Sequence, residues 1–165
     1  DNLIRAIKNT QNFTSDNHLV IIGPYSEKYK KKLVDLKNKL KLDSLITFLD
    51  PIYNNLKYDV FKCSKFFCLT SHQENFGISI VEALSHGIPV LITNKVNIWR
   101  EIKKNHAGFV CDDNIDSITK KLNKMIFLKD DKYKLTKANA LRCYKNNFNS
   151  SIVTKKFVSF LKNDH

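Results

Sequence analysis

Two carboxylates with a glycine between them form the segment of this chain best suited to chemistry. Glu74 and Glu82 flank Gly77, in a segment that follows the apolar run FFCL at 66–69 and leads into a helical pattern. A glycine here lets the backbone approach a ligand and leaves the first helical N–H groups uncovered, which favours phosphate. Glu82 lies about 7–8 Å along the helix axis from Gly77. This layout suits an elongated ligand with hydroxyls at both ends and phosphates between them, as in a nucleotide sugar.

The same residues also have a purely structural interpretation. An acidic residue near a helix start often caps the helix or offsets its dipole, and Glu82 would then be solvated. Ile78, Val81 and Leu84 are expected to form the buried face of this helix. From residue types and spacing alone, both interpretations stay open.

The elements around this segment alternate between strand and helix. Short, wholly apolar strand runs separated by helices are typical of a parallel sheet covered by helices on both faces. The strands are expected over residues 18–22, 44–49, 65–70, 90–93 and 108–111. The helices are expected around Leu3–Ile7 and over 26–41, 55–63, 77–86, 98–103, 113–128, 132–146 and 152–162. Phe148, Phe157 and Phe160 are expected to pack the closing helix. We therefore expect an α/β, Rossmann-like fold in one domain, 1–165, with ligands beyond the carboxyl ends of the strands.

Composition narrows the function classes. The chain has 165 residues, 42% of them hydrophobic and 27% charged, which is ordinary for a globular protein. No apolar run approaches the roughly 18 residues of a membrane span. The net charge of +12 allows a non-catalytic basic module that binds nucleic acid or an anionic membrane. The excess of Lys over Arg speaks against nucleic acid, because Arg supplies most bidentate base and phosphate contacts. A general enrichment in Lys would explain the charge equally well.

The four cysteines, Cys63, Cys68, Cys111 and Cys143, match no metal-binding spacing. Each sits in an apolar stretch, so we expect reduced thiols in the core of a cytoplasmic protein. The sequence predicts no metal site.

An ordered series of motifs resembles the C-terminal, donor-binding half of the retaining group 1 glycosyltransferases, which have the GT-B fold. The resemblance covers nearly the whole chain. It rests on LVIIG at 19–23, ITFLD at 46–50, CLTSHQENFG at 68–77, VEALSHGIPV at 81–90, WREI at 99–102 and AGFV at 107–110. The paired glutamates alone would be a weak signal, but flanked by Phe-Gly and by G-x-P-V they resemble the E-x7-E signature of that family.

The resemblance implies a role for each matching position. Glu74 would be the catalytic residue at the donor sugar, and Glu82 would bind the ribose hydroxyls. The backbone around Asn75, Phe76, Gly77 and Ile78 would lie at the diphosphate and sugar, and Gly23 with the turn Asp50, Pro51 and Ile52 at the nucleobase.

The family further implies sugar transfer from a nucleoside diphosphate sugar to a glycan or lipid-linked acceptor, as in polysaccharide biosynthesis. No cofactor, no metal and no protein nucleophile would be required. The acceptor would be held mainly by an N-terminal domain outside this chain, in an enzyme of the cytoplasm that touches the inner membrane face peripherally. Nucleic acid is not an expected partner.

Departures from the family pattern set further expectations. Asp50 stands where the family usually has Gly. Pro24 follows Gly23 where the family commonly has a second small residue. The family's first strand, central in its sheet, and a loop supplying Arg and Lys to the diphosphate have no counterpart here. We therefore expect a fragment of a two-domain enzyme with an incomplete site. A catalytically inactive relative is a third alternative, against which the intact glutamate pair argues.

Overall fold

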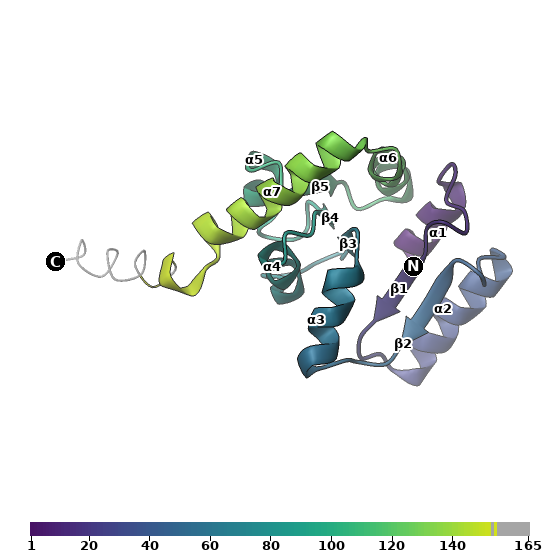
Figure 1. Cartoon of the computed structure of the whole chain (residues 1–165). Coiled ribbons are helices and arrows are strands. Elements are labelled where there is room, and N and C mark those ends of the chain that lie inside the picture. Colours follow the sequence, from purple (N-terminus) through teal and green to yellow (C-terminus); the bar gives the residue numbers. More distant parts are fainter. Residues whose placement is uncertain (153, 155–165) are drawn as a thin grey trace. The chain divides into compact units, whose positions relative to one another are not determined.

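The computed structural model describes residues 1–152 and 154, which form two compact units (Figure 1). The first unit contains residues 1–63 and 113–127, and the second contains 64–112 and the described residues from 128 onward. Both units are built of parallel strands flanked by helices, so the α/β, Rossmann-like prediction is confirmed. That residues 1–165 form one domain stays a prediction.

The first unit has a two-stranded parallel sheet. Strand β1 (Leu19–Ile22) pairs with β2 (Ile46–Leu49), and Ile22 lies opposite Leu49 in the register. Its helices are α1 (Asn2–Asn9), α2 (Glu27–Lys39), α3 (Asn54–Cys63) and α6 (Ile115–Ile126). Ser26 caps α2 by accepting a hydrogen bond from the Tyr29 amide, and Asn114 caps α6 in the same way.

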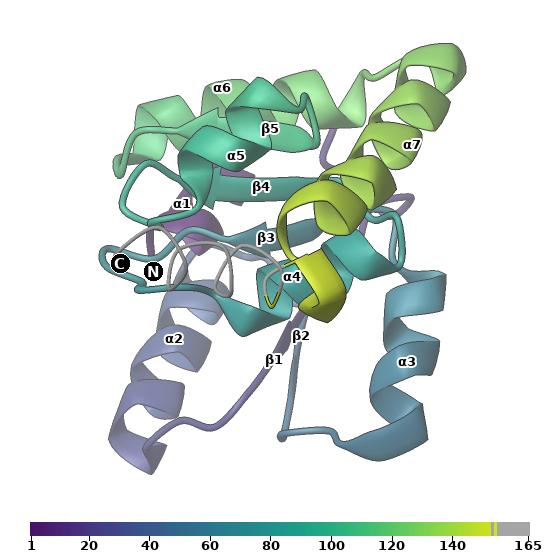
Figure 2. The same ribbon diagram turned by 90° about the vertical axis from the view of Figure 1, so that its left-hand side faces the viewer.

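The second unit has a three-stranded parallel sheet in the order β3-β4-β5. These strands are Phe67–Leu69, Val90–Thr93 and Gly108–Cys111, and the central β4 is buried along its whole length. Three helices surround it: α4 (Ile78–Ser85), α5 (Trp99–Lys104) and α7 (Asp130–Asn147). Helix α7 packs against both α4 and α5 (Figure 2).

Most predicted elements are found within two or three residues of their expected bounds. The strands over 90–93 and 108–111 have the predicted limits, because Pro89 and the turn before Gly108 delimit them. The helix predicted over 152–162, with Phe157 and Phe160, lies almost wholly outside the described residues. None of the helices within 1–152 and 154 is long and apolar enough to cross a membrane.

All four cysteines are free thiols, but only part of the core assignment is confirmed. Cys111 and Cys143 are buried and Cys68 is partly buried, whereas Cys63 is exposed. The prediction was wrong for Cys63 because this residue ends α3, beyond the helix's buried Phe61. Desolvation raises the pKa of Cys68 to about 12 and that of Cys143 to about 11.

Thiol reactivity should follow this division. At pH 8 we expect one thiol, Cys63, to react rapidly with Ellman's reagent in the folded chain, because thiolate is the reactive form. The raised pKa values leave Cys68 and Cys143 protonated until the pH approaches 11–12. Counting fast and slow thiols by absorbance, with Cys63→Ser as the control, checks this; a second fast thiol in the folded protein would contradict it.

Candidate donor-binding site

The segment 71–78 joins the carboxyl end of β3 to helix α4, at the sheet edge where ligands bind in folds of this type. The fully buried Thr93, the last residue of β4, donates its hydroxyl to the Ser71 carbonyl at 2.6 Å. Because β3 and β4 are parallel neighbours, both strands end at this edge. Thr93 therefore anchors the loop, a role that sequence reasoning missed although Thr93 is a polar residue ending the apolar run VLIT.

Glu74 is fixed through its backbone. It forms an isolated parallel bridge with Val96, in which the Glu74 amide donates to the Lys95 carbonyl and the Asn97 amide donates to the Glu74 carbonyl, both at 3.2 Å. The loop that precedes α4 is thus tied to the segment that follows β4. This pairing holds the Glu74 side chain at the sheet edge without immobilising its carboxylate directly.

Gly77 produces the sharp entry into α4. Its backbone is left-handed, with φ 70° and ψ 63°, and its amide donates to Glu74 Oε1 at 3.3 Å. One carboxylate oxygen of Glu74 therefore supports the turn, which confirms part of the structural interpretation. No side chain caps the helix start at Gly77, as the sequence predicts, and the positive end of the α4 dipole points into the loop.

Substituting Gly77 tests how tightly this turn is built. A Cβ at Gly77 would lie 2.6 Å from Ile80 Cδ1, and Ala tolerates a positive φ poorly. We expect Gly77→Ala to lower the free energy of unfolding by about 2 kcal/mol. Ile80→Val removes Cδ1, so a double-mutant cycle by urea denaturation should show a coupling of about 1 kcal/mol. Strictly additive effects would contradict this packing.

Glu82 lies in the middle of α4 and is half-buried. Its carbonyl accepts the Ser85 hydroxyl at 2.7 Å and contacts His86 Nδ1 at 2.9 Å, so the helix is well ordered around it. Glu82 is five positions after Gly77, which corresponds to about 7.5 Å along the helix axis. The structure therefore brings Glu74, the helix start and Glu82 together on one loop and helix.

The residues between the two glutamates differ in exposure. Phe76 and Ile78 are 48% and 69% exposed, and Asn75 is also exposed. Of the predicted buried face, Leu84 is confirmed, Val81 is only half-buried, and the prediction for Ile78 is wrong. Ile80, Ala83 and Leu84 form the buried face, and Ile78 lies opposite Ile80 on the helix. Phe76 packs edge-to-face against Phe148 at the end of α7, with ring centroids 6.0 Å apart.

The residues predicted to contact the nucleobase lie in the first unit. Gly23 and Asp50 directly follow β1 and β2, so the parallel register places them next to each other at the carboxyl edge of that sheet. Pro51 and Ile52 continue the chain toward α3 and are half-buried. The structure therefore describes the predicted donor site as two separate groups of residues, one in each unit.

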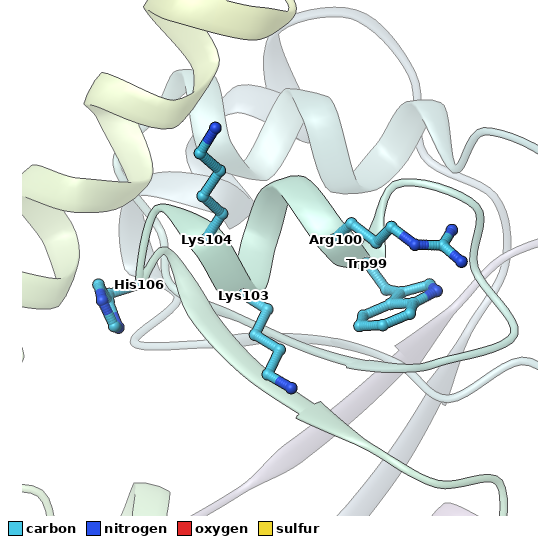
Figure 3. A pocket seen from close by; sticks show the side chains of 5 residues that line it. All are labelled: Trp99, Arg100, Lys103, Lys104 and His106. Atoms are coloured by element: carbon cyan, nitrogen blue, oxygen red, sulfur yellow. The ribbon is translucent and has the colours of Figure 1, made fainter.

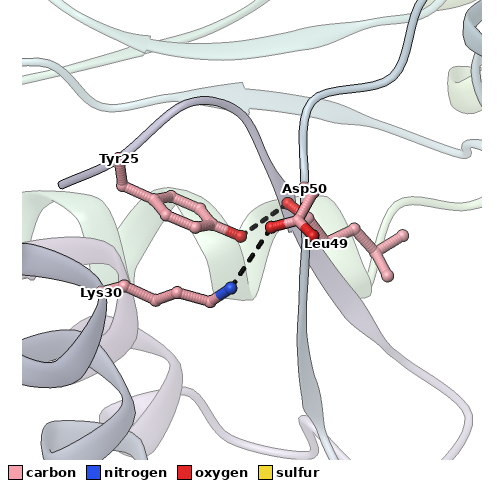
Figure 4. Close-up of polar contacts among 4 residues, drawn as sticks. All are labelled: Tyr25, Lys30, Leu49 and Asp50. Carbon is pink, nitrogen blue, oxygen red and sulfur yellow. Dashed lines mark hydrogen bonds and ion pairs between the residues drawn. The ribbon is translucent and has the colours of Figure 1, made fainter. Parts of the chain in front are cut away.

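Asp50 has a partner that the sequence did not indicate. Lys30 Nζ, on α2, lies 3.3 Å from the Asp50 carboxylate, and the Tyr25 hydroxyl donates to the Leu49 carbonyl at 2.7 Å (Figure 4). The hydrogen bond to Asp50 raises the pKa of Lys30, and Lys30 Nζ also lies 4.8 Å from the Tyr25 ring centroid. The carboxylate found where the resembled family has glycine is thus engaged within its own unit.

Among the residues that the structure describes, no group of three or more His, Cys, Asp or Glu side chains could hold a metal ion. Transfer without a metal stays a prediction.

This chain is similar to glycosyltransferases in sequence and to solved glycosyltransferase structures in fold. The chain is 27% identical over 96 residues to D-inositol 3-phosphate glycosyltransferase of Rhodococcus jostii, a match covering 57% of this chain and 21% of that protein. It is 26% identical over 113 residues to an uncharacterized glycosyltransferase of Haemophilus influenzae, covering 67% and 31%. The matched stretch spans only about a fifth to a third of these curated relatives.

Three solved structures share the architecture. WaaG, a glycosyltransferase involved in lipopolysaccharide biosynthesis, superposes with a TM-score of 0.79 at 21% identity, covering 94% of this chain and 41% of WaaG. HepE of Anabaena, crystallised with UDP and glucose, gives 0.83 at 19% identity, covering 98% and 44%. The C-terminal domain of LpcC from Francisella tularensis gives 0.78 at 20% identity, covering 90% and 78%. These likenesses show the half of a GT-B fold.

The sequence profile of the family described as glycosyl transferases group 1 matches residues 1–142, most of the chain. Together with the fold and the loop at the sheet edge, this match shows that the chain belongs to the group 1 glycosyl transferase family.

Proposed function

We propose that this chain binds the donor of a retaining glycosyltransferase, a nucleoside diphosphate sugar. The observation that carries the proposal is the Glu74–Gly77–Glu82 arrangement, with an uncapped helix start between two carboxylates at the sheet edge. Glu82 would accept hydrogen bonds from the ribose hydroxyls, and Glu74 would lie beside the donor sugar. HepE, a structural neighbour, was crystallised with UDP-glucose, which supports a donor of this class.

The proposed chemistry follows from charge. When the bond between the sugar and the diphosphate breaks, negative charge grows on the leaving diphosphate and positive charge on the anomeric carbon. The amides at the start of α4 and the helix dipole would stabilise the negative charge on the diphosphate. The Glu74 carboxylate would stabilise the positive charge on the anomeric carbon. The acceptor hydroxyl would attack from the face that the diphosphate leaves and would pass its proton to the departing diphosphate oxygen. This retains the anomeric configuration and needs neither metal nor protein nucleophile.

The whole enzyme's setting is also part of the proposal. We place the acceptor, a glycan or lipid-linked sugar, mainly on a second domain, and the enzyme in the cytoplasm. The family match supports a transferase over a non-catalytic basic module. The intact glutamate pair on an ordered loop speaks against an inactive relative.

Amide chemical shifts would test the proposal residue by residue. On titration with UDP-glucose, we expect the largest 15N–1H shifts at residues 75–78 and along the first turn of α4. Inorganic phosphate serves as the control for a simple anion site at the helix start. Shifts that avoid this loop, or that phosphate reproduces fully, would overturn the proposal.

A further inference from the structure

A basic and aromatic surface lies on α5, outside the proposed donor loop. Five side chains line a hollow of about 450 Å³ there (Figure 3), which we call the α5 surface: Trp99, Arg100, Lys103, Lys104 and His106. None of them is acidic, and Arg100, Lys103, Lys104 and His106 are all exposed. Three permanent cations are therefore concentrated on a six-residue helix.

The aromatic ring is part of this charged surface. The Arg100 guanidinium lies 4.7 Å from the Trp99 ring centroid, alongside the ring in Figure 3, and Lys103 Nζ lies 5.8 Å from it. Such cation–π contacts hold the cations near the indole. Trp99 is half-buried, so the surface combines a partly accessible indole with positive charge.

The remaining residues of α5 turn toward the protein. Ile102 is fully buried and Glu101 is half-buried, and the Glu101 backbone carbonyl accepts the Cys143 thiol of α7 at 3.8 Å. At 100° per residue, positions 99, 100, 103 and 104 share one side of the helix, and 101 and 102 share the other. The α5 surface is thus the outward side of a helix whose opposite side packs against the unit.

We propose that the α5 surface binds an anionic membrane at the level of the lipid headgroups. A pocket for one small anion would bury its charged side chains, whereas these cations are exposed and spread along a helix. That arrangement complements a broad negative surface, where each Lys or Arg contributes about fivefold to the binding constant. An indole with a polar N–H prefers the boundary between headgroups and acyl chains, which explains Trp99 among the cations. This proposal does not rest on the donor site.

The chain's single tryptophan makes the test direct, because all indole fluorescence comes from Trp99. With vesicles of 30% phosphatidylglycerol in phosphatidylcholine, we expect binding, a blue shift of the emission and quenching by brominated lipid. Pure phosphatidylcholine vesicles should produce none of these effects. Raising the salt concentration should weaken binding, since surface charges are screened.

Two triple variants that lose the same charge distinguish binding through the α5 surface from binding through the net charge of the chain. Arg100→Gln with Lys103→Gln and Lys104→Gln should weaken vesicle binding roughly 100-fold, from about fivefold per residue. Lys28→Gln with Lys31→Gln and Lys32→Gln removes three exposed cations from α2 and should weaken it much less. Circular dichroism confirms that both variants fold.

Several outcomes would overturn the proposal. They are equal losses in the two triple variants, an unshifted Trp99 emission on bound vesicles, and the absence of binding to the anionic vesicles. Binding of duplex RNA but not of vesicles, lost in the α5 variant, would assign the surface to nucleic acid instead.

Discussion

Glu82→Gln is expected to weaken binding of the nucleotide sugar by roughly 10- to 100-fold. A hydrogen bond to a charged group contributes about 1.5–3 kcal/mol, and a carboxylate that accepts from two ribose hydroxyls is weakened by loss of its charge and of one acceptor. The substitution keeps the size of a half-buried side chain in α4, so the helix should stay folded. Isothermal titration calorimetry with the donor measures the change.

The matched control is Glu101→Gln, a second half-buried glutamate on a helix of the same unit. It should leave donor affinity within about twofold of the original chain. If Glu82→Gln bound the donor as tightly as Glu101→Gln, the assignment of Glu82 to the ribose would be wrong. A 2′,3′-dideoxy nucleotide sugar should lose affinity for the original chain and show little further loss with the variant.

Gly108→Ala is expected to disrupt the second unit. Gly108 lies opposite Val90 in the parallel pairing of β4 and β5, and a Cβ there would lie 2.1 Å from the Val90 carbonyl oxygen and 2.6 Å from its nitrogen. Backbone atoms of the buried central strand cannot move aside as a side chain can. We expect a loss of at least about 3 kcal/mol in the free energy of unfolding, or a fall in Tm of roughly 10 °C.

Val90→Ala distinguishes a backbone clash from an overfilled core. Because the clashing atoms belong to the Val90 main chain, shortening its side chain should not rescue Gly108→Ala. Thermal and urea denaturation of the two single variants and the double variant give the comparison. A double variant as stable as Val90→Ala alone would contradict the close approach of the two strands.

The sequence predicted the structure best where residue types that favour one element also favour burial in the core. The run VLIT after Pro89 is largely apolar and rich in β-branched residues, so its strand character and its burial were predictable. The series of motifs also located the Glu74–Glu82 segment at the end of a strand and the start of a helix, where the structure has it.

What the sequence could not show depends on contacts between distant residues. The hydroxyl of Thr93 reaches back 22 positions to Ser71, and Lys30 reaches 20 positions to Asp50. The periodicity of apolar residues along the sequence does not predict such pairs. Ile78 illustrates a second limit: apolar spacing fits more than one face of a short helix, and packing of Ile80 decided which face was buried.

Saturation-transfer NMR tests the central claim most directly. The chain is mixed in turn with UDP-, GDP- and ADP-sugars, and each experiment is repeated with Glu82→Gln and with Glu101→Gln. The account predicts transfer to the ribose and base protons of one nucleotide, strongly reduced by Glu82→Gln and unchanged by Glu101→Gln. Absence of transfer from a folded chain to all three donors, or transfer that Glu82→Gln leaves intact, would contradict it.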